Sequence, residues 1–401
     1  MSVSRKEILR YLAGLPVFGA FAGISGSKTD PKRISATPRR DYFNELGVRK
    51  LINARGAYTT LTGSLMTPEV VDAIQYASDH FVSLIELNEK AGARIAEMLN
   101  CEDAHVSAGA ASAITLATAA ALTGRDREKM RAIPHLPGPQ KEVILPRGHR
   151  IYEQQFTACG VKLVEVNSAR EMERAMNVNT VLAFYYNAYR DQKISREEFV
   201  RIGREHEVPT FNDCASDVPP VENLFKYIEM GFDLVTFSGG KGISGPQSAG
   251  LLFGRKDLIE AARMNHSPYG SIGRGMKVDK EEIIGIMVAL EVYLKKDHDN
   301  ERATWESWVS RLQDVLSDIR GVSTEMYLPP VANHVPHLRI TWEHSVVKTT
   351  PGEVVQKLRH GHPSIEVMAS EEDITLNMFM VQPHEVDIIG QRTKQVLMES
   401  V

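Results

Sequence analysis

Between residues 104 and 253 the sequence alternates short, apolar, β-prone runs with helical or polar stretches. Such runs separated by helices are typical of a mostly parallel sheet that helices cover on both faces. Ligands of open α/β sheets bind at the carboxyl ends of the strands. We therefore expect an α/β fold around a mostly parallel seven-stranded sheet. The predicted strands are Ala104–Ser107, Val143–Leu145, Lys162–Val166, Thr180–Tyr185, Pro209–Asn212, Leu234–Phe237 and Ala249–Phe253.

The 401 residues suffice for a large core and a smaller second domain. A helical entry and a turn are predicted for residues 41–57. Thr67 as N-cap and Pro68 at the first helical position predict a helix start, with helical periodicity to about Leu99. A long helix is expected from about Lys280 to Lys296, and a small α/β domain follows it. We predict three divisions of the chain. Residues 1–40 form a signal-like segment and linker, residues 41–296 an entry segment and a large domain, and residues 297–401 a small C-terminal domain.

The first residues are typical of a secretory signal. Arg5 and Lys6 precede the mostly apolar stretch Tyr11–Ala22, which ends in small residues. The Arg-Lys pair resembles a twin-arginine signal whose second arginine is replaced, and such signals export folded, cofactor-containing proteins. We expect an exported, periplasmic protein with no membrane span in its mature form. The alternative is an amphipathic helix that packs on a neighbouring subunit of a cytoplasmic protein.

Composition excludes several classes of site. The formal net charge of -4 offers no basic footprint for nucleic acid, so no nucleic-acid partner is expected. Three cysteines are too few and too scattered for a disulfide framework or a structural zinc site. The thirteen histidines show no metal-ligand spacing, so we expect no metal.

One lysine follows a predicted strand inside a glycine-rich turn. Lys241 lies in Ser238-Gly-Gly-Lys-Gly242, directly after the run that ends at Phe237. A lysine that points into a cleft is partly desolvated, which lowers the pKa of its amine and makes it a Schiff-base nucleophile. The competing interpretation is a solvated surface lysine.

Three further strand ends carry residues that suit a phosphorylated aromatic ring. The small residues of Ser107–Ser112 open a helix whose N–H groups would hold a phosphate, or they serve close helix–sheet packing. His149 would stack on the ring, or is an ordinary loop histidine. Asp213 would pair with a protonated pyridine nitrogen, or caps a helix. With Lys241 in the same order along the chain, these residues predict a site for pyridoxal phosphate.

From about Tyr42 to its end the chain resembles the fold-type I pyridoxal phosphate enzymes (the aspartate aminotransferase-like transferase fold). Within them it is most similar to the selenocysteine synthase-like group that includes D-glucosaminate-6-phosphate ammonia-lyase. The matching segments are Leu51–Ala54, Gly63–Val70, Ser107–Ala111, Arg147–Arg150, Asn212–Asp213, Thr236–Lys241, Gly245–Gln247 and Gly273–Lys280.

This resemblance implies roles for individual residues. Lys241 would be the Schiff-base lysine, Asp213 the partner of the ring nitrogen and His149 the ring-stacking residue. The phosphate would contact Gly109, Ala110, Ala111 and Ser238. Arg274 and Lys277 would bind an anionic part of cofactor or substrate, or form a solvated basic turn. Arg55 lies in a stretch that departs from the ammonia-lyase relatives, and is a further candidate for binding a substrate anion.

The function expected from these residues and this resemblance is a lyase. It would act on a small amino acid or amino sugar acid by β-elimination, with loss of water followed by hydrolytic release of ammonia to give a 2-oxo acid, and with Lys241 as the general base. An amino-acid racemase or a β-replacement transferase is the alternative, and a cofactor-binding protein without catalysis is the non-enzyme alternative. The resemblance also implies a homodimer or larger homo-oligomer.

Overall fold

The computed structural model describes residues 40–401 of the chain. The predicted export signal lies in residues 1–39, outside the described residues. Residues 40–49 carry helix α2 (Tyr42–Glu45), whose N-cap Asp41 accepts a hydrogen bond from the backbone N–H of Asn44. Residues 50–401 form one compact unit, which contains everything discussed below.

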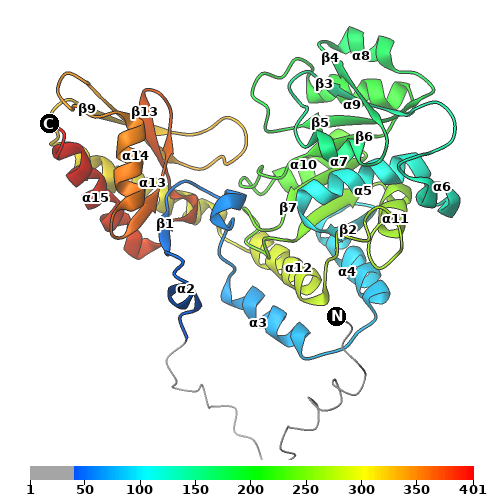
Figure 1. Cartoon of the computed structure of the whole chain (residues 1–401), viewed down its shortest axis with the longest axis horizontal. Coiled ribbons are helices and arrows are strands. Elements are labelled where there is room, and N and C mark those ends of the chain that lie inside the picture. The colour runs from blue at the N-terminus through cyan, green and yellow to red at the C-terminus, as the bar shows by residue number, and fades with distance from the viewer. Residues whose placement is uncertain (1–39) are drawn as a thin grey trace, which may run out of the picture. The chain divides into compact units, whose positions relative to one another are not determined.

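All seven predicted runs are strands of one sheet, in the order β2-β8-β7-β6-β5-β3-β4 (Figure 1). β8 is antiparallel to both of its neighbours, and the other pairs are parallel. The expected α/β fold with a mostly parallel sheet is therefore confirmed. The strands are β2 (Asp103–Ser107), β3 (Glu142–Pro146), β4 (Lys162–Val166), β5 (Thr180–Tyr186), β6 (Thr210–Asp213), β7 (Leu234–Ser238) and β8 (Gly250–Gly254).

Helices cover both faces of this sheet because successive strand side chains point to opposite sides. On β5, Leu182 and Phe184 pack with helices α5, α7 and α11, whereas Ala183 and Tyr185 pack with α4, α9, α10 and α12. The helices of this part are α3 (Pro68–Ser78), α4 (Leu84–Leu99), α5 (Gly109–Thr123), α6 (Arg127–Ala132), α7 (Glu153–Thr157), α8 (Ala169–Ala175), α9 (Arg196–Glu205), α10 (Asn223–Met230), α11 (Lys256–Met264) and α12 (Lys280–Leu294).

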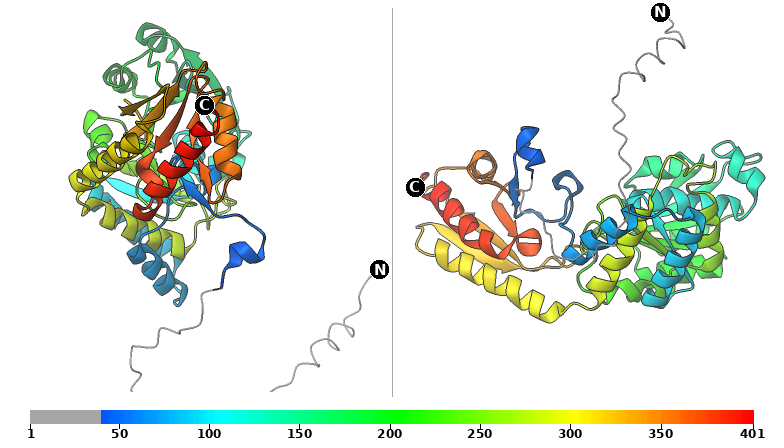
Figure 2. Two further views of the ribbon diagram at one scale, coloured as in Figure 1. Left: turned by 90° about the vertical axis from the view of Figure 1, so that its left-hand side faces the viewer. Right: turned by 90° about the horizontal axis from the view of Figure 1, so that it is seen from below.

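The helix predicted from Thr67 to Leu99 is two helices, since residues 79–83 separate α3 from α4. The predicted long helix is α12, which begins at Lys280 with Asp279 as N-cap in a capping box. In the right-hand view of Figure 2, α12 and the yellow helix that follows it lead from the large sheet toward the C-terminal part. No helix within residues 40–401 is both long enough and apolar enough to span a bilayer.

The C-terminal part has its own hydrophobic core around a four-stranded sheet of order β12-β13-β10-β9. The segment predicted as a turn near residue 51 instead begins as strand β1 (Leu51–Asn53), which pairs in parallel with β11. Through Ile52 and Ala54 this segment joins the C-terminal core. The elements are β9 (Val322–Tyr327), β10 (His337–Trp342), β11 (Ser364–Glu366), β12 (Met368–Ala369), β13 (Asp373–Asn377), α13 (His298–Leu316), α14 (Pro351–His360) and α15 (Val386–Met398).

Candidate active site at the carboxyl edge of the large sheet

Strand register brings the predicted site residues to one edge of the sheet. Ser107, at the end of β2, is opposite Gly250 of β8, which in turn is opposite Ser238 at the end of β7. At the end of β6, Asp213 is opposite Tyr186 of β5. The small-residue turn after β2, the aspartate of β6 and the lysine turn after β7 therefore lie at the same edge.

Within residues 40–401, no side chain caps the helix α5 that the small-residue turn begins. The N-cap residue Ala108 has no side chain that caps the helix, so the first-turn N–H groups, among them those of Ala110 and Ala111, lack a capping acceptor. Gly109 has a left-handed φ of +75°, and a Cβ there would have no neighbour closer than 3.9 Å. An uncapped N-terminus beside open space fits the phosphate of a cofactor.

Lys241 lies in a tightly packed turn. Its Nζ donates a hydrogen bond to Ser216 Oγ at 2.7 Å. A Cβ on Gly242 would lie 2.1 Å from the carbonyl oxygen of Val218, so the lysine turn packs directly against the 214–219 loop. Burial lowers the pKa of Lys241, although the negative charge of Asp213 opposes this shift. The amine is therefore held near a hydroxyl and biased toward its neutral, nucleophilic form.

Asp213 is a buried carboxylate with one unpaired oxygen. Its side chain is 1% exposed, and Oδ1 accepts a hydrogen bond from the backbone N–H of Ala215 at 3.0 Å. Within residues 40–401, Oδ2 is buried and has no hydrogen-bond partner. Burial raises the pKa of Asp213 to about 6. No described helix begins at this residue, so the alternative role as a helix cap is wrong. The unpaired oxygen fits a protonated ring nitrogen.

His149 is completely buried behind this edge. Its Nδ1 accepts a hydrogen bond from the backbone N–H of Tyr186 at 2.9 Å, and the ring of Tyr189 packs edge-on at 5.2 Å between centroids. Burial lowers the pKa of His149 to about 4, which keeps the imidazole neutral. Its ring-stacking role stays a prediction. Tyr152, near Asp213, is a further aromatic side chain and is 46% exposed. Its partial burial and the negative charge of Asp213 raise its pKa.

A second buried carboxylate, not identified from the sequence, lies behind Lys241. Asp217 is 2% exposed and accepts hydrogen bonds from Tyr227 Oη at 2.9 Å and from Asn187 Nδ2. Its charge, like that of Asp213, favours the protonated form of Lys241. In the sequence, Asp217 could have been noticed because it lies four residues after Asp213 in the same strand-end loop. In the structure it directly follows Ser216, which accepts the hydrogen bond of Lys241.

Arg274 and Lys277 are exposed on the loop that precedes α12. This loop is anchored by His266, whose Nδ1 shares a hydrogen bond of 2.8 Å with Nε2 of buried His105 and whose Nε2 contacts the carbonyl oxygen of Met276. Among the described residues, neither basic side chain forms an ion pair. Their predicted role in anion binding therefore remains a prediction.

Comparison with known proteins agrees with this geometry. A family model described as SelA: L-seryl-tRNA selenium transferase matches residues 51–320. The chain is 28% identical to D-glucosaminate-6-phosphate ammonia lyase of Salmonella typhimurium, over 86% of this chain and 93% of that protein. It is 29% identical to 5'-C-glycyluridine monooxygenase-decarboxylase of a Streptomyces species, over 80% and 83% respectively.

A solved structure of D-glucosaminate-6-phosphate ammonia-lyase superimposes with a TM-score of 0.79 at 26% identity, over 90% of this chain and all of that one. Serine palmitoyltransferase of Sphingomonas wittichii superimposes with a TM-score of 0.58 at 14% identity, over 88% of each chain, and shares the fold. The expected fold-type I architecture, the selenocysteine synthase-like group and the pyridoxal phosphate cofactor are thereby confirmed. The chain belongs to the family described as SelA: L-seryl-tRNA selenium transferase.

Proposed function

We propose that this protein is a pyridoxal phosphate-dependent lyase that eliminates water from a small amino acid or amino sugar acid. Hydrolysis of the resulting imine then takes up one water and releases ammonia, which leaves a 2-oxo acid. The observation that carries the proposal is the unpaired, buried oxygen of Asp213 at the same sheet edge as Lys241. The likeness to D-glucosaminate-6-phosphate ammonia lyase, which extends over 93% of that protein, supports the reaction class.

Each residue of the edge has a distinct task in this proposal. Lys241 Nζ would hold the cofactor, Asp213 Oδ2 would accept the hydrogen bond of its ring nitrogen, and the N–H groups that begin α5 would bind its phosphate. When bound, pyridoxal phosphate supplies an electron sink for the bonds at the substrate's α-carbon. Once the amine of the substrate has displaced it from the cofactor, Lys241 Nζ would remove the α-proton as general base, and burial lowers the pKa of this amine, which favours its neutral form. Ser216 Oγ, 2.7 Å away, orients that amine.

Absorbance of the purified protein tests the cofactor assignment. The wild type should show a yellow absorbance band, and borohydride reduction should attach the cofactor covalently to the peptide that contains Lys241. Lys241→Ala should lack this attachment. Lys348→Ala, which removes an exposed lysine on the C-terminal part, is the matched control and should behave as the wild type. A colourless wild type that stays colourless with added pyridoxal phosphate would contradict the proposal.

Product analysis separates the lyase from its alternatives. With D- and L-hydroxy amino acids and amino sugar acids, a lyase releases ammonia and a 2-oxo acid in equal amounts. A racemase exchanges the α-proton with solvent and consumes no substrate, and a β-replacement enzyme requires a second nucleophile. A protein without catalysis would bind the cofactor and do none of these. The formal net charge of -4 gives no support to a tRNA substrate.

We also propose that the protein is a homodimer or larger homo-oligomer. Support comes from a run of exposed apolar side chains on and beside α3 and at the start of α4, a pattern that marks interaction surfaces. Phe81→Asp should shift the mass measured by light scattering toward the monomer, whereas Val178→Asp, at an exposed position elsewhere, should not. The apolar run consists of Leu65, Met66, Val71, Tyr76, Phe81, Val82 and Ile85.

Export to the periplasm is proposed from the N-terminal sequence alone. Replacement of Arg5 by lysine should retain a full-length reporter fusion in the cytoplasm, because the twin-arginine-like pair is then lost. Cell fractionation of the wild-type fusion measures the outcome, and a wild-type fusion confined to the cytoplasm would contradict export.

A further inference from the structure

A cavity of about 400 Å³ lies where the segment after β1 meets α14. It is lined by two arginines from distant parts of the sequence, Arg55 and Arg359, together with Tyr58, Gln356 and Met368. We call this cavity the arginine pocket. On α14 the lining residues follow a helical spacing that places Gln356 and Arg359 on one face.

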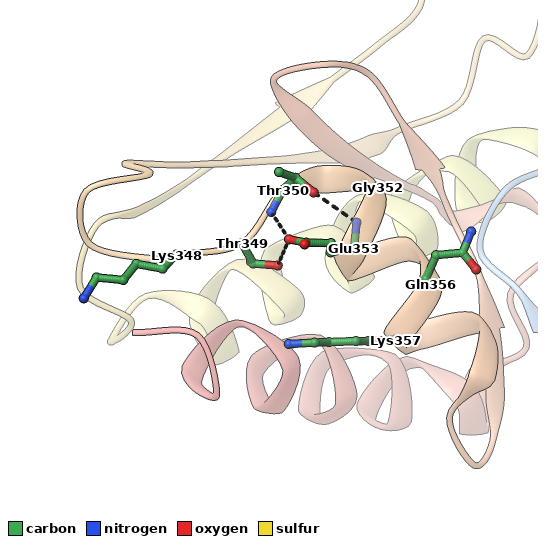
Figure 3. A pocket seen from close by; sticks show the side chains of 7 residues that line it. All are labelled: Lys348, Thr349, Thr350, Gly352, Glu353, Gln356 and Lys357. Atoms are coloured by element: carbon green, nitrogen blue, oxygen red, sulfur yellow. Dashed lines mark hydrogen bonds between the residues drawn. The ribbon is translucent and has the colours of Figure 1, made fainter.

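The neighbouring cavity over the start of α14 has a different character. There Glu353 accepts hydrogen bonds from the backbone N–H of Thr350 and from Thr349 Oγ1, while the Glu353 N–H donates to Thr350 Oγ1 (Figure 3). The helix N-terminus is thus capped by the chain's own side chains. At that end the chain's own side chains supply the hydrogen-bond acceptors, whereas in the arginine pocket the buried Nε of Arg55 has no partner within residues 40–401.

The arginine pocket carries an excess of positive charge. Arg359 pairs with the buried carboxylate of Glu366 through two hydrogen bonds, of 2.6 and 2.9 Å. This bidentate pairing uses both carboxylate oxygens. Arg55 Nη1 lies 4.0 Å from Glu366 Oε2, which is beyond hydrogen-bond distance. One carboxylate therefore faces two guanidinium groups.

Arg55 is held in place although its side chain makes no hydrogen bond among the described residues and approaches Glu366 only at ion-pair distance. Within residues 40–401 its Nε is buried and has no hydrogen-bond partner. Its guanidinium carbon lies 5.0 Å from the ring centroid of Tyr58. The backbone beneath it is rigid, because Asn53 Oδ1 accepts hydrogen bonds from the N–H groups of Arg55 and Gly56, and Asn53 Nδ2 donates to the carbonyl oxygen of Gly56. Arg55 thus offers a preorganised guanidinium with an unpaired Nε, near a carboxylate that is already engaged by Arg359, and such a group can bind an anion.

A short segment connects the arginine pocket with the lysine turn. Tyr58 forms one wall of the pocket, and its hydroxyl lies 3.6 Å from the sulfur of Met368. The carbonyl oxygen of Tyr58 accepts a hydrogen bond from Gly63, and the next N–H, of Ser64, donates to Gly240 at 2.9 Å. Gly240 is the residue before Lys241. The pocket and the reactive amine are therefore joined through one hydrogen-bonded stretch of chain.

We propose that the arginine pocket binds an anionic group of the substrate, a carboxylate or a phosphate, with Arg55 as the bidentate partner and Arg359 neutralised by Glu366. This inference rests on the proposed function, since it assigns one end of the amino acid or amino sugar acid substrate to this pocket. The fork geometry of a guanidinium matches both carboxylate and phosphate oxygens.

Calorimetric titration of the cofactor-loaded protein with inorganic phosphate and, separately, with succinate tests the proposal. Loading fills the cofactor's own phosphate site first. Arg55→Gln should weaken binding of the preferred probe about ten- to a hundredfold, as expected for loss of a hydrogen bond to a charged group. A preference for phosphate assigns the pocket to a phosphorylated substrate, and a preference for succinate assigns it to a carboxylate.

Two further variants make the result decisive. Gln356→Glu places a carboxylate in the pocket from an exposed position, so it should weaken anion binding without touching Arg55. Arg302→Gln, at an exposed position on α13, is the control and should bind as the wild type. With a turned-over substrate, Arg55→Gln should raise KM and leave kcat and the cofactor absorbance nearly unchanged.

The proposal is overturned if the wild type binds neither probe, or if Arg55→Gln and Gln356→Glu both bind as tightly as the wild type. Probe binding requires no chemistry. Failure of the proposed function, seen as a missing cofactor band, is therefore distinguishable from failure of the pocket assignment.

Discussion

Replacement of Asp213 by asparagine is expected to make the stability of the cofactor-free protein less sensitive to pH. In the wild type the carboxyl is buried, with Oδ2 unpaired among the described residues, and burial raises its pKa from 3.8 to about 6. The folded state therefore holds a proton on Asp213 more tightly than the unfolded chain does. Stability that is present below the unfolded pKa is lost as pH rises through about 6.

The magnitude follows from the size of the shift. About two pKa units, at 1.36 kcal/mol each, correspond to roughly 3 kcal/mol of stability that the wild type loses between about pH 3.5 and pH 7. Asparagine has nearly the same shape and does not titrate in this range. Its own unpaired amide changes stability equally at every pH, so the difference between the two pH values isolates the charge.

Urea unfolding of cofactor-free wild type and Asp213→Asn, measured at pH 4 and pH 7.5, provides the assay. Whatever the absolute stability of the variant, it should gain about 2.4 kcal/mol relative to the wild type between these two pH values, because at pH 4 the wild type has already lost a small part of the full effect. With cofactor bound at neutral pH, the wild type should be the more stable of the two proteins, because its carboxylate then has a cationic partner. Equal pH profiles for the two cofactor-free proteins would refute the assignment of Asp213 as an unpaired buried carboxylate.

Three further tests concern backbone packing and a buried histidine. Gly242→Ala should destabilise the fold by about 1 to 3 kcal/mol in urea unfolding, because the new Cβ meets the carbonyl oxygen of Val218, whereas Gly352→Ala meets nothing and should cost little. Ala332 has a left-handed φ of 48°, which suits glycine and penalises a β-branched side chain. In urea unfolding, Ala332→Val should therefore be about 1 to 2 kcal/mol less stable than Ala332→Gly. Burial holds the pKa of His105 well below 6.5, so the free energy of unfolding should fall as pH drops below that value. In His105→Gln this loss of stability at acid pH should be smaller, and a loss equal to that of the wild type would contradict the prediction.

The sequence alone determined the elements of the large sheet and much of the order of its site residues. Strand and helix signals are local, because side-chain periodicity, capping residues and glycine-rich turns act over a few neighbouring positions. All seven strands were predicted for this reason. Lys241 and Asp213 could be selected because each follows or ends such a strand, and carboxyl ends of parallel strands share one edge.

Only the tertiary structure decided what depends on contacts between distant segments. β1 could not be paired with β11 from sequence, since a three-residue strand has little pattern and its partner lies more than three hundred residues later. The burial of His149 behind Tyr189, and the second carboxylate of Asp217, likewise come from long-range packing. Arg55 and Arg359 meet at one carboxylate because α14 and the segment after β1 come together only in the folded chain, and charge balance is a property of that assembled pocket.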